Sequence, residues 1–404
     1  MPSKTRSYPA IVLFVLGLIQ AIWPLTMDLY LPALPLIGRD LASSSNIVQL
    51  TLTGAFMGMA IGQLLAGPVS DRIGRVKPLV IVLVIYTLAT VACSLAPSIE
   101  TLIAARFIQG FGASASSVIV SAMVRDMSSG ALMVRLIARL QLVNGVFVVA
   151  SPAIGAQLLA FLDWRGLFWI LVVYGSLLLI ATISVLVRFE TNPPEKRALR
   201  DGAGLRDDYR VLLADKKYLA AVAVGGLLWA AMMSYMASSA FLFTELYGLD
   251  ATAYAIIFGA HGALMIAGAQ LSARLVPRFG VERIMVLGLT GAAISAIALV
   301  VSVTVAPDAG LLPFVVPLFF FTTSFGFVSP SIQSAALENH ATRAGTASSL
   351  LGATSMVLGS LAVPFVGAFG TETPAPVTIA MLACAAAALT VANVAFRKRR
   401  GVYP

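Results

Sequence analysis

The sequence predicts an all-α polytopic membrane protein with twelve transmembrane helices in two six-helix bundles. Three observations predict it: the composition, the number of long apolar stretches, and one charged segment in the middle of the chain. Of the 404 residues, 59% are hydrophobic and only 11% are charged, and the mean hydropathy is +0.93. Soluble globular chains carry about 25% charged residues. We therefore expect this chain to lie in a lipid bilayer.

Twelve stretches are long and apolar enough to cross a bilayer, for which about 20 predominantly apolar residues are needed. They are predicted at residues 10–31, 47–69, 78–97, 101–125, 136–160, 166–187, 217–243, 253–273, 284–305, 311–335, 345–368 and 376–396. Apolar runs of this length predict helices rather than the strands of a membrane barrel. The first run is too long for a secretory leader, so we expect it to be retained as a helix.

A long mixed-charge segment with Pro and Gly separates the first six stretches from the last six. The predicted parts are an N-terminal bundle at 1–187, a cytoplasmic linker at 188–216, a C-terminal bundle at 217–396 and a basic tail at 397–404. The loops between the other stretches are short. This layout predicts two helical bundles joined by a linker.

The two halves share a weak internal repeat. Gly62 lies near the end of the second stretch and Arg72 just after it, and Gly268 and Arg278 stand at the matching positions of the eighth, 206 residues later. A repeat at the same place in each half indicates an internal duplication. Duplicated membrane halves with a site between them are typical of transporters.

Basic residues concentrate on one side of the predicted spans. The chain has a net charge of +9, yet the loops on the opposite side hold only Arg39 and Arg165. Cytoplasmic loops are enriched in Lys and Arg, so we expect both termini in the cytoplasm. The basic residues at 397–400 are expected to anchor the tail to lipid headgroups rather than to bind nucleic acid.

Small residues recur at helical spacing along two predicted spans. They are Gly54, Gly58, Gly62 and Ala66 in the second span, and Gly345, Gly352 and Gly359 in the eleventh. Small residues on one helix face let two backbones approach closely in lipid. We interpret both stripes as helix contacts; the alternative is simple tolerance of glycine in membrane helices.

Two ionisable residues lie inside predicted spans, where such residues are rare and usually face a cavity or a partner. Asp28 is near the outer end of the first span, and Arg106 is in the outer part of the fourth. Burial favours a protonated carboxyl, and a nearby guanidinium favours the carboxylate, so Asp28 is a candidate proton-coupling site with Arg106. The plainer interpretations are an interfacial Asp28 that reaches water and an Arg106 that holds backbone carbonyls.

Aromatic, methionine and amide side chains are candidates to line a substrate cavity, with contact to lipid as the alternative. Such a lining suits apolar, adaptable ligands. The candidates are Trp23, Met27, Tyr30, Gln109, Asn144, Tyr235 and Phe241. His261 is the only histidine inside a predicted span. It either relays protons or donates at a helix contact.

The sequence carries no pattern of an ATP-driven pump or a metal enzyme. It has no GxxxxGK[ST] loop and no cluster with metal-ligand spacing. Cys93 and Cys384 lie in predicted spans, where we expect them to pack as small apolar residues. We expect no enzyme activity, no catalytic residue, no metal, no nucleic-acid partner and no cofactor other than coupling protons.

The loop after the second span resembles motif A of the major facilitator superfamily. In GQLLAGPVSDRIGRVK, the residues that match G-x-L-x(5)-D-R-x-G-R are Gly62, Leu64, Asp71, Arg72, Gly74 and Arg75. The resemblance extends over the whole chain and implies the twelve-helix, two-bundle fold of that family. In the family this motif is a cytoplasmic latch between the bundles, which implies the same role for these residues.

Two further stretches resemble motifs of drug–proton antiporters in this superfamily. RFIQGFGAS is similar to motif B, with matches at Arg106, Gln109, Gly110 and Gly112. In the family that arginine is linked to proton transfer. ASPAIGA resembles antiporter motif C through Pro152 and Gly155, although Ser151 and Ala156 stand where the motif has glycine.

The stretches MDLYLPALP (27–35), DWRGLFWI (163–170) and RFETNPP (188–194) resemble the Bcr/CflA drug-resistance subfamily. That group includes bicyclomycin and chloramphenicol efflux proteins, and Asp28 matches its acidic position in the first span. The resemblance implies a monomeric antiporter of the bacterial cytoplasmic membrane that exports small hydrophobic drugs by alternating access. Two alternatives stay open: a proton symporter that takes up a small metabolite, and a non-transporting sensor or scaffold.

Overall fold

The computed structural model describes residues 9–127, 130–193, 205–305, 310–340, 343–369 and 373–396. These residues form helices, turns and bends but no β-strand, which confirms the all-α prediction. The chain divides into two compact units, Met1–Leu205 and Arg206–Pro404. The division falls inside the predicted linker, of which residues 194–204 lie outside the described residues, as does the predicted basic tail at 397–404.

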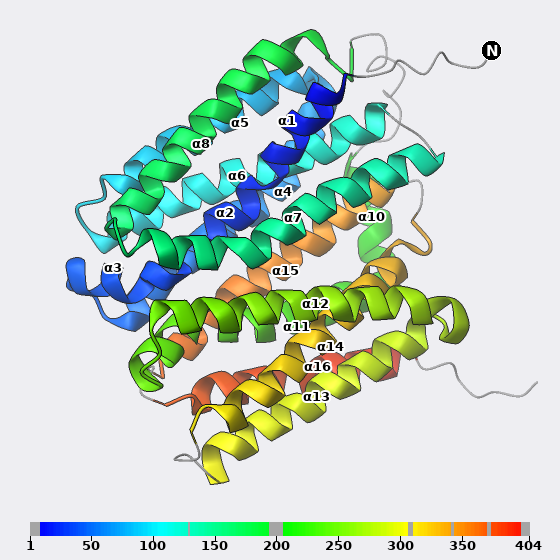
Figure 1. Cartoon of the computed structure of the whole chain (residues 1–404). Helices are drawn as coiled ribbons and strands as arrows, with labels where there is room; N and C mark the ends of the chain where they lie inside the picture. Colours follow the sequence, from blue (N-terminus) through cyan, green and yellow to red (C-terminus); the bar gives the residue numbers. More distant parts are fainter. Residues whose placement is uncertain are drawn as a thin grey trace, which may run out of the picture. The chain divides into compact units, whose positions relative to one another are not determined.

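The first unit is built from eight α-helices of the described chain (Figure 1). They are α1 (Ala10–Gln20), α2 (Ile22–Asp28), α3 (Leu34–Asp40), α4 (Ser45–Ile73), α5 (Val76–Ser94), α6 (Ile99–Met127), α7 (Gly130–Leu158) and α8 (Trp164–Val185). Short 3-10 turns follow α2 at Leu31–Ala33 and α8 at Leu186–Arg188.

The second unit contains the remaining helices of the described chain. They are α10 (Leu205–Ala214), which begins at the division, α11 (Lys216–Phe241), α12 (Ala251–Phe279), α13 (Val281–Val305), α14 (Leu312–Leu337), α15 (Ala344–Gly367) and α16 (Ala375–Phe396). A π-helical turn, Leu242–Leu246, extends α11.

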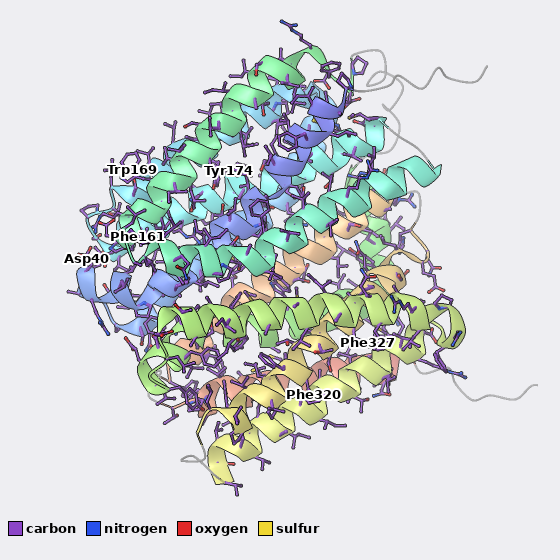
Figure 2. The ribbon with its side chains drawn as sticks, in the orientation of Figure 1. Asp40, Phe161, Trp169, Tyr174, Phe320 and Phe327 are labelled. Carbon is purple, nitrogen blue, oxygen red and sulfur yellow. The ribbon has the colours of Figure 1, made fainter. Side chains whose placement is uncertain are left out.

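Eleven helical runs of the described chain are long and apolar enough to cross a membrane. The predicted span at 136–160 lies in α7, where the apolar helix is the shorter stretch Leu142–Leu158. Arg139 interrupts the apolar character at the start of this predicted span. Large apolar side chains such as Trp169 of α8 and Phe320 of α14 are exposed on their helices (Figure 2), as contact with lipid requires.

The first predicted span, 10–31, is confirmed as part of the longer apolar run Ala10–Asp40, but this run is not one continuous helix. The chain breaks after α1 at Gln20, resumes as α2 and continues through α3 to Asp40. Pro24 has no N–H for the Gln20 carbonyl four residues earlier, so the helix is interrupted at Ala21. Asp28 therefore lies at the end of a short helix inside a bent run.

Glycines bring α4 and α6 into backbone contact. A Cβ on Gly58 would lie 1.9 Å from the carbonyl oxygen of Phe107, and one on Gly62 would lie 2.5 Å from that of Phe111. The same holds for Gly54 at 2.9 Å from the Ile103 carbonyl oxygen. The predicted small-residue contact on the second span is confirmed at these glycines.

The second unit repeats this contact between α12 and α14. Gly268, the repeat counterpart of Gly62, would place a Cβ 2.2 Å from the carbonyl oxygen of Thr323. Gly326 of α14 approaches the Met265 carbonyl of α12 in the same way, at 1.9 Å. The weak sequence repeat thus corresponds to equivalent helix packing in the two units.

Candidate functional site

Asp28 is a buried carboxyl group at the end of α2. Its side chain is 1% exposed, and its Oδ1 has no hydrogen-bond partner within the described chain. A buried ionised carboxylate without a donor or cation is costly, whereas burying a neutral carboxyl costs far less. Which neighbouring groups could stabilise the ionised form of Asp28 is therefore the main question about this site.

Arg106 of α6 holds the backbone on which Asp28 lies. The side chain is fully buried, and Nη1 donates to the Thr26 carbonyl at 3.0 Å and to Oε1 of Gln109 at 2.7 Å. Its guanidinium carbon lies 4.1 Å from the centroid of the Tyr30 ring, a cation–π contact. Arg106 therefore contacts the chain on both sides of Asp28, at Thr26 in α2 and at Tyr30 in the turn after it.

Asp28 and Arg106 form no ion pair in the described chain. The guanidinium instead uses its donors on the Thr26 carbonyl, on Gln109 and on the sulfur of Met27, 3.9 Å from Nη2. This is the plainer of the two interpretations of Arg106, a donor to backbone carbonyls. Arg106 contacts the residues on either side of Asp28, so it fixes the position of the helix that ends at this carboxyl group.

Three of the predicted cavity residues have their polar atoms engaged inside the first unit. The Tyr30 hydroxyl lies 3.0 Å from Oγ1 of Thr51, and Nε2 of Gln109 donates to Oγ1 of Thr90 at 2.9 Å. Met27 contributes its sulfur to Arg106. All three are buried, so they first of all build the support around Arg106. Their role as a lining stays a prediction.

The other predicted cavity residues make none of the hydrogen bonds of this cluster that are described above. Trp23 of α2 and Asn144 of α7 are half-buried in the first unit. Tyr235 and Phe241 belong to α11 of the second unit, where both are buried. The Tyr235 hydroxyl has no hydrogen-bond partner among the described residues.

The motif C residues reach the same segment as Arg106. Pro152 and Gly155 both lie in α7 and are buried. A Cβ on Gly155 would lie 2.0 Å from the carbonyl oxygen of Leu29, the residue after Asp28. The segment of Asp28 is therefore held by α6 at Thr26 and by α7 at Leu29, a convergence that the sequence did not reveal.

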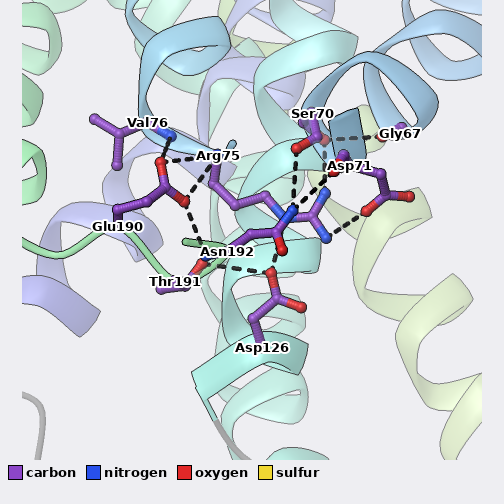
Figure 3. A network of polar contacts seen from close by, with 9 residues as sticks. All are labelled: Gly67, Ser70, Asp71, Arg75, Val76, Asp126, Glu190, Thr191 and Asn192. Carbon is purple, nitrogen blue, oxygen red and sulfur yellow. Dashed lines mark hydrogen bonds and ion pairs between the residues drawn. The ribbon is translucent and has the colours of Figure 1, made fainter. Parts of the chain in front are cut away.

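Motif A folds around a buried arginine. Gly74 has a φ of 98°, which side-chain-bearing residues rarely adopt. Arg75 then donates from Nε to Asp126 at 2.7 Å and from Nη1 to Ser70 at 2.7 Å, and pairs through Nη2 with Asp71 at 2.6 Å (Figure 3). Burial alone would lower the pKa of Arg75, but the two carboxylates outweigh it and raise that pKa.

The segment after α8 closes on motif A. The Glu190 carboxylate accepts hydrogen bonds from the backbone N–H of Arg75, at 2.9 Å, and of Val76, at 3.0 Å (Figure 3). Asn192 donates from Nδ2 to the Asp71 carbonyl at 3.0 Å. A carboxylate at the start of α5 also complements the positive end of the helix dipole.

Sequence reasoning assigned no role to Asp126, Glu190 or Asn192. The stretch RFETNPP carries the only sequence signal for two of them, because Glu190 and Asn192 are an acidic and an amide residue just past a predicted span. Asp71 and Arg72 are exposed and Gly62 lies in the α4–α6 contact. The motif A bonds described here all join residues of the first unit, and a latch between bundles stays a prediction.

The described residues contain no group of three or more His, Cys, Asp or Glu side chains that could hold a metal ion. Cys93 is buried, with Sγ 3.8 Å from Oε1 of Gln109, and Cys384 is partly buried.

Comparison with known proteins finds transporters along most of the chain. The family model described as Major Facilitator Superfamily matches residues 16–364. The uncharacterized MFS-type transporter YdgK of Bacillus subtilis is 34% identical over 359 residues, 88% of each chain.

Two further relatives have names that refer to drugs. The bicyclomycin resistance protein homolog of Haemophilus influenzae is 27% identical over 375 residues, 93% of each chain. The multidrug resistance protein MdtL of Escherichia coli O157:H7 is 28% identical over 334 residues, 82% of each chain. Among solved structures, a D-xylose-proton symporter superimposes with a TM-score of 0.73 at 15% identity, over 95% of this chain and 97% of the other.

Proposed function

This chain belongs to the Major Facilitator Superfamily, and we propose that it exports small hydrophobic drugs in exchange for protons. The names of two relatives, a bicyclomycin resistance protein homolog and a multidrug resistance protein, support drug export. We extend the proposal to neutral antibiotics of the chloramphenicol or bicyclomycin type. The protein would act as a monomer in the bacterial cytoplasmic membrane, with both termini in the cytoplasm.

The observation that carries the proposal is the buried Asp28 carboxyl with its unpartnered Oδ1. In alternating access, the site opens to one side of the membrane at a time. Asp28 takes up a proton when it is open to the outside and releases it when it is open to the cytoplasm. Drug and proton need only prefer different states for their fluxes to be coupled.

Arg106 has a positioning role in this cycle. It holds the Thr26 carbonyl and the Tyr30 ring, so it fixes the short helix that ends at Asp28. Gly155 holds the next residue, Leu29, from the side of α7. A movement of α6 or α7 would therefore move the carboxyl group and change its surroundings, which is how a conformational change would load or release the proton.

Replacement of the carboxyl group tests the proposal. We expect Asp28→Asn to abolish proton-driven export, because the amide cannot exchange a proton. The measurement is chloramphenicol accumulation in cells, with and without a protonophore, at matched amounts of protein in the membrane. Asp40→Asn is the matched control: Asp40 ends the same helical run but is exposed and bonds to Trp164 and Arg165.

Export at the wild-type level by Asp28→Asn would contradict the assignment of the proton site. Loss of export in both variants would point to a general structural effect of carboxylate removal. Loss in Asp28→Asn alone, with Asp40→Asn as active as the wild type, is the expected pattern.

The alternative function is proton-coupled uptake of a small metabolite. The same Asp28 carboxyl could couple uptake to protons. Ser151 and Ala156 replace two glycines of antiporter motif C, which is the observation that favours this alternative. The direction of transport separates the two. Lower drug accumulation that collapses with a protonophore supports export; unchanged drug accumulation together with proton-driven uptake supports a symporter.

A further inference from the structure

Two polar side chains of the second unit are buried next to each other, each with one polar atom that has no hydrogen-bond partner within the described chain. Tyr235 of α11 is 0% exposed and His261 of α12 is 2% exposed. Their ring centroids lie 5.5 Å apart. Neither the Tyr235 hydroxyl nor the His261 Nδ1 has a hydrogen-bond partner within the described chain. A buried polar atom without a partner is costly, so a ligand that supplies the missing hydrogen bond would stabilise each of these groups.

The surrounding side chains are aromatic, and one of them is a second tyrosine whose hydroxyl does have a hydrogen-bond partner. Phe258 lies 5.3 Å from the His261 ring and Phe243 lies 6.4 Å from the Tyr235 ring, between centroids. In the same cluster, the Tyr254 hydroxyl is satisfied within the protein, 3.1 Å from Oγ of Ser239. The helices thus satisfy one tyrosine of this cluster and leave the hydroxyl of its neighbour open.

The charged residues near these helices lie at their ends. Glu245 is exposed in the turn after α11, and Asp250 caps α12 through the backbone N–H of Ala253 at 2.7 Å. The cluster itself offers one hydroxyl, one imidazole nitrogen and aromatic faces. Binding sites of this kind combine apolar area with a few placed polar groups that orient the ligand.

We propose that Tyr235 and His261 form a hydrogen-bonding contact for the polar end of a neutral drug that carries a hydroxyl or amide group on an apolar body. The contact rests on the proposed function and specifies its substrate class. A site built to hydrogen-bond a ligand rejects an analogue without the bonding group, because its own polar atoms are then left unpaired. An aromatic cation without donors or acceptors is therefore a poor ligand at this contact.

Histidine labelling gives a readout that needs no mutation in the site. The chain contains only two histidines, so ¹⁵N-histidine-labelled protein in lipid nanodiscs yields two sets of ring signals, and His340→Gln identifies those of His261. We expect saturating chloramphenicol or bicyclomycin to shift the His261 nitrogen signals. Tetraphenylphosphonium, an aromatic cation without hydrogen-bonding groups, should leave them in place.

Matched variants measure the contact in the same protein. Removal of one neutral hydrogen bond corresponds to about a three- to ten-fold rise in Kd, which we expect for chloramphenicol with Tyr235→Phe and with His261→Phe. Tyr254→Phe removes a hydroxyl that is already satisfied by Ser239 and should stay within about two-fold of the wild type. Thermal unfolding of each variant shows whether it is folded.

The inference is overturned if either drug binds the wild type while the His261 signals stay unchanged, or if Tyr235→Phe and Tyr254→Phe bind it equally. It is also overturned if tetraphenylphosphonium alone moves the signals, or if neither neutral drug binds. Export driven by protons with no His261 shift would sink the inference and leave the proposed function intact. A His261 shift without proton-driven export would support the drug contact and contradict the proposed function.

Discussion

At the scale of single residues, Arg106 acts through geometry as much as through charge. Its guanidinium donates from Nη1 to Thr26 and Gln109 and lies over the Tyr30 ring. None of these partners is an anion. A planar fork can serve several acceptors and a ring face at once, whereas a lysine ammonium is a compact point charge. The side chain is therefore specified by shape as well as by charge.

We expect Arg106→Lys to lose most transport and to lower the melting temperature by a few degrees. A hydrogen bond from a charged group contributes about 1.5–3 kcal/mol, and lysine cannot replace both bonds and the ring contact. Thermal unfolding and drug accumulation measure the two effects. Arg165→Lys is the control: Arg165 also contacts a carbonyl, a carboxylate and a ring, but it is far more exposed. Transport by Arg106→Lys at the wild-type rate would show that charge alone suffices.

At the scale of helices, contact between α4 and α6 depends on the absence of side chains. Gly58 of α4 meets the Phe107 carbonyl, and Gly110 of α6 meets the Ala55 carbonyl, where a Cβ would lie only 2.1 Å away. Backbone atoms cannot move aside as the end of a flexible side chain can. The two helices would have to separate, and α6 carries Arg106.

Gly58→Ala is therefore expected to destabilise the first unit strongly and to reduce transport. Gly17→Ala in α1 of the same unit is the control, because a Cβ there would make an ordinary contact with Cγ2 of Val143, at 3.9 Å. Alanine favours a helix by up to about 1 kcal/mol over glycine, so Gly17→Ala should keep or raise stability. Detergent-solubilised yield and thermal unfolding measure both. Equal melting temperatures for the two variants would refute the close contact.

The start of α11 is fixed by one carboxylate. Asp215 accepts from the backbone N–H of Lys217 at 2.8 Å and of Tyr218 at 3.3 Å, and its Oδ2 lies 2.9 Å from Nε2 of His340. Partial burial would raise the pKa of Asp215, but the backbone donors and His340 outweigh it, so that its pKa lies below the usual value. The ionised form is therefore favoured by folding.

A depressed folded pKa gives a definite direction to the pH dependence. The stabilisation from Asp215 is fully present above its unfolded pKa of about 3.9 and is lost as the pH falls through the folded pKa. We expect the melting temperature of the wild type to exceed that of Asp215→Asn from pH 7 down to about pH 4 and the difference to shrink below that. A difference that grows as the pH falls below about 4 would contradict the assignment.

At the scale of the whole molecule, the two units repeat one packing scheme with different polar content. Gly62 and Gly268 make equivalent contacts in α4 and α12. The first unit buries the carboxyl and guanidinium groups of Asp28 and Arg106, and the second buries the hydroxyl of Tyr235 and the imidazole of His261. This division suits a transporter in which one half handles the proton and the other contacts a neutral drug.

Coupling to one proton sets an upper limit on the drug gradient. A charge that moves through 100 mV releases about 2.3 kcal/mol, and about 1.4 kcal/mol corresponds to a ten-fold ratio. One proton per neutral drug molecule therefore supports roughly a forty-fold gradient. Proteoliposomes with an imposed potassium diffusion potential and labelled chloramphenicol measure it. A ratio near unity at every potential would rule out coupling, and a much larger ratio would require more protons.

The sequence by itself determined the membrane location, the helical class, the two halves and the helix contact at Gly58. Those properties follow from the composition and from the spacing of residues along a single helix, both of which can be read directly from the sequence. It also pointed to Asp28 and Arg106, because an ionisable residue in an apolar run stands out. Pro24 indicates the break in the first span, but a prediction based only on the length of the apolar run does not detect it.

Only the tertiary structure decided which groups meet. The Thr26 carbonyl lies 80 positions from Arg106 in the chain, and Leu29 meets Gly155 through a different helix. Tyr235 and His261 are brought together by the packing of α11 and α12. Helical periodicity tells which residues share a face, but the partner of that face depends on how the helices rotate and cross, and that is set by the packing of all of them together.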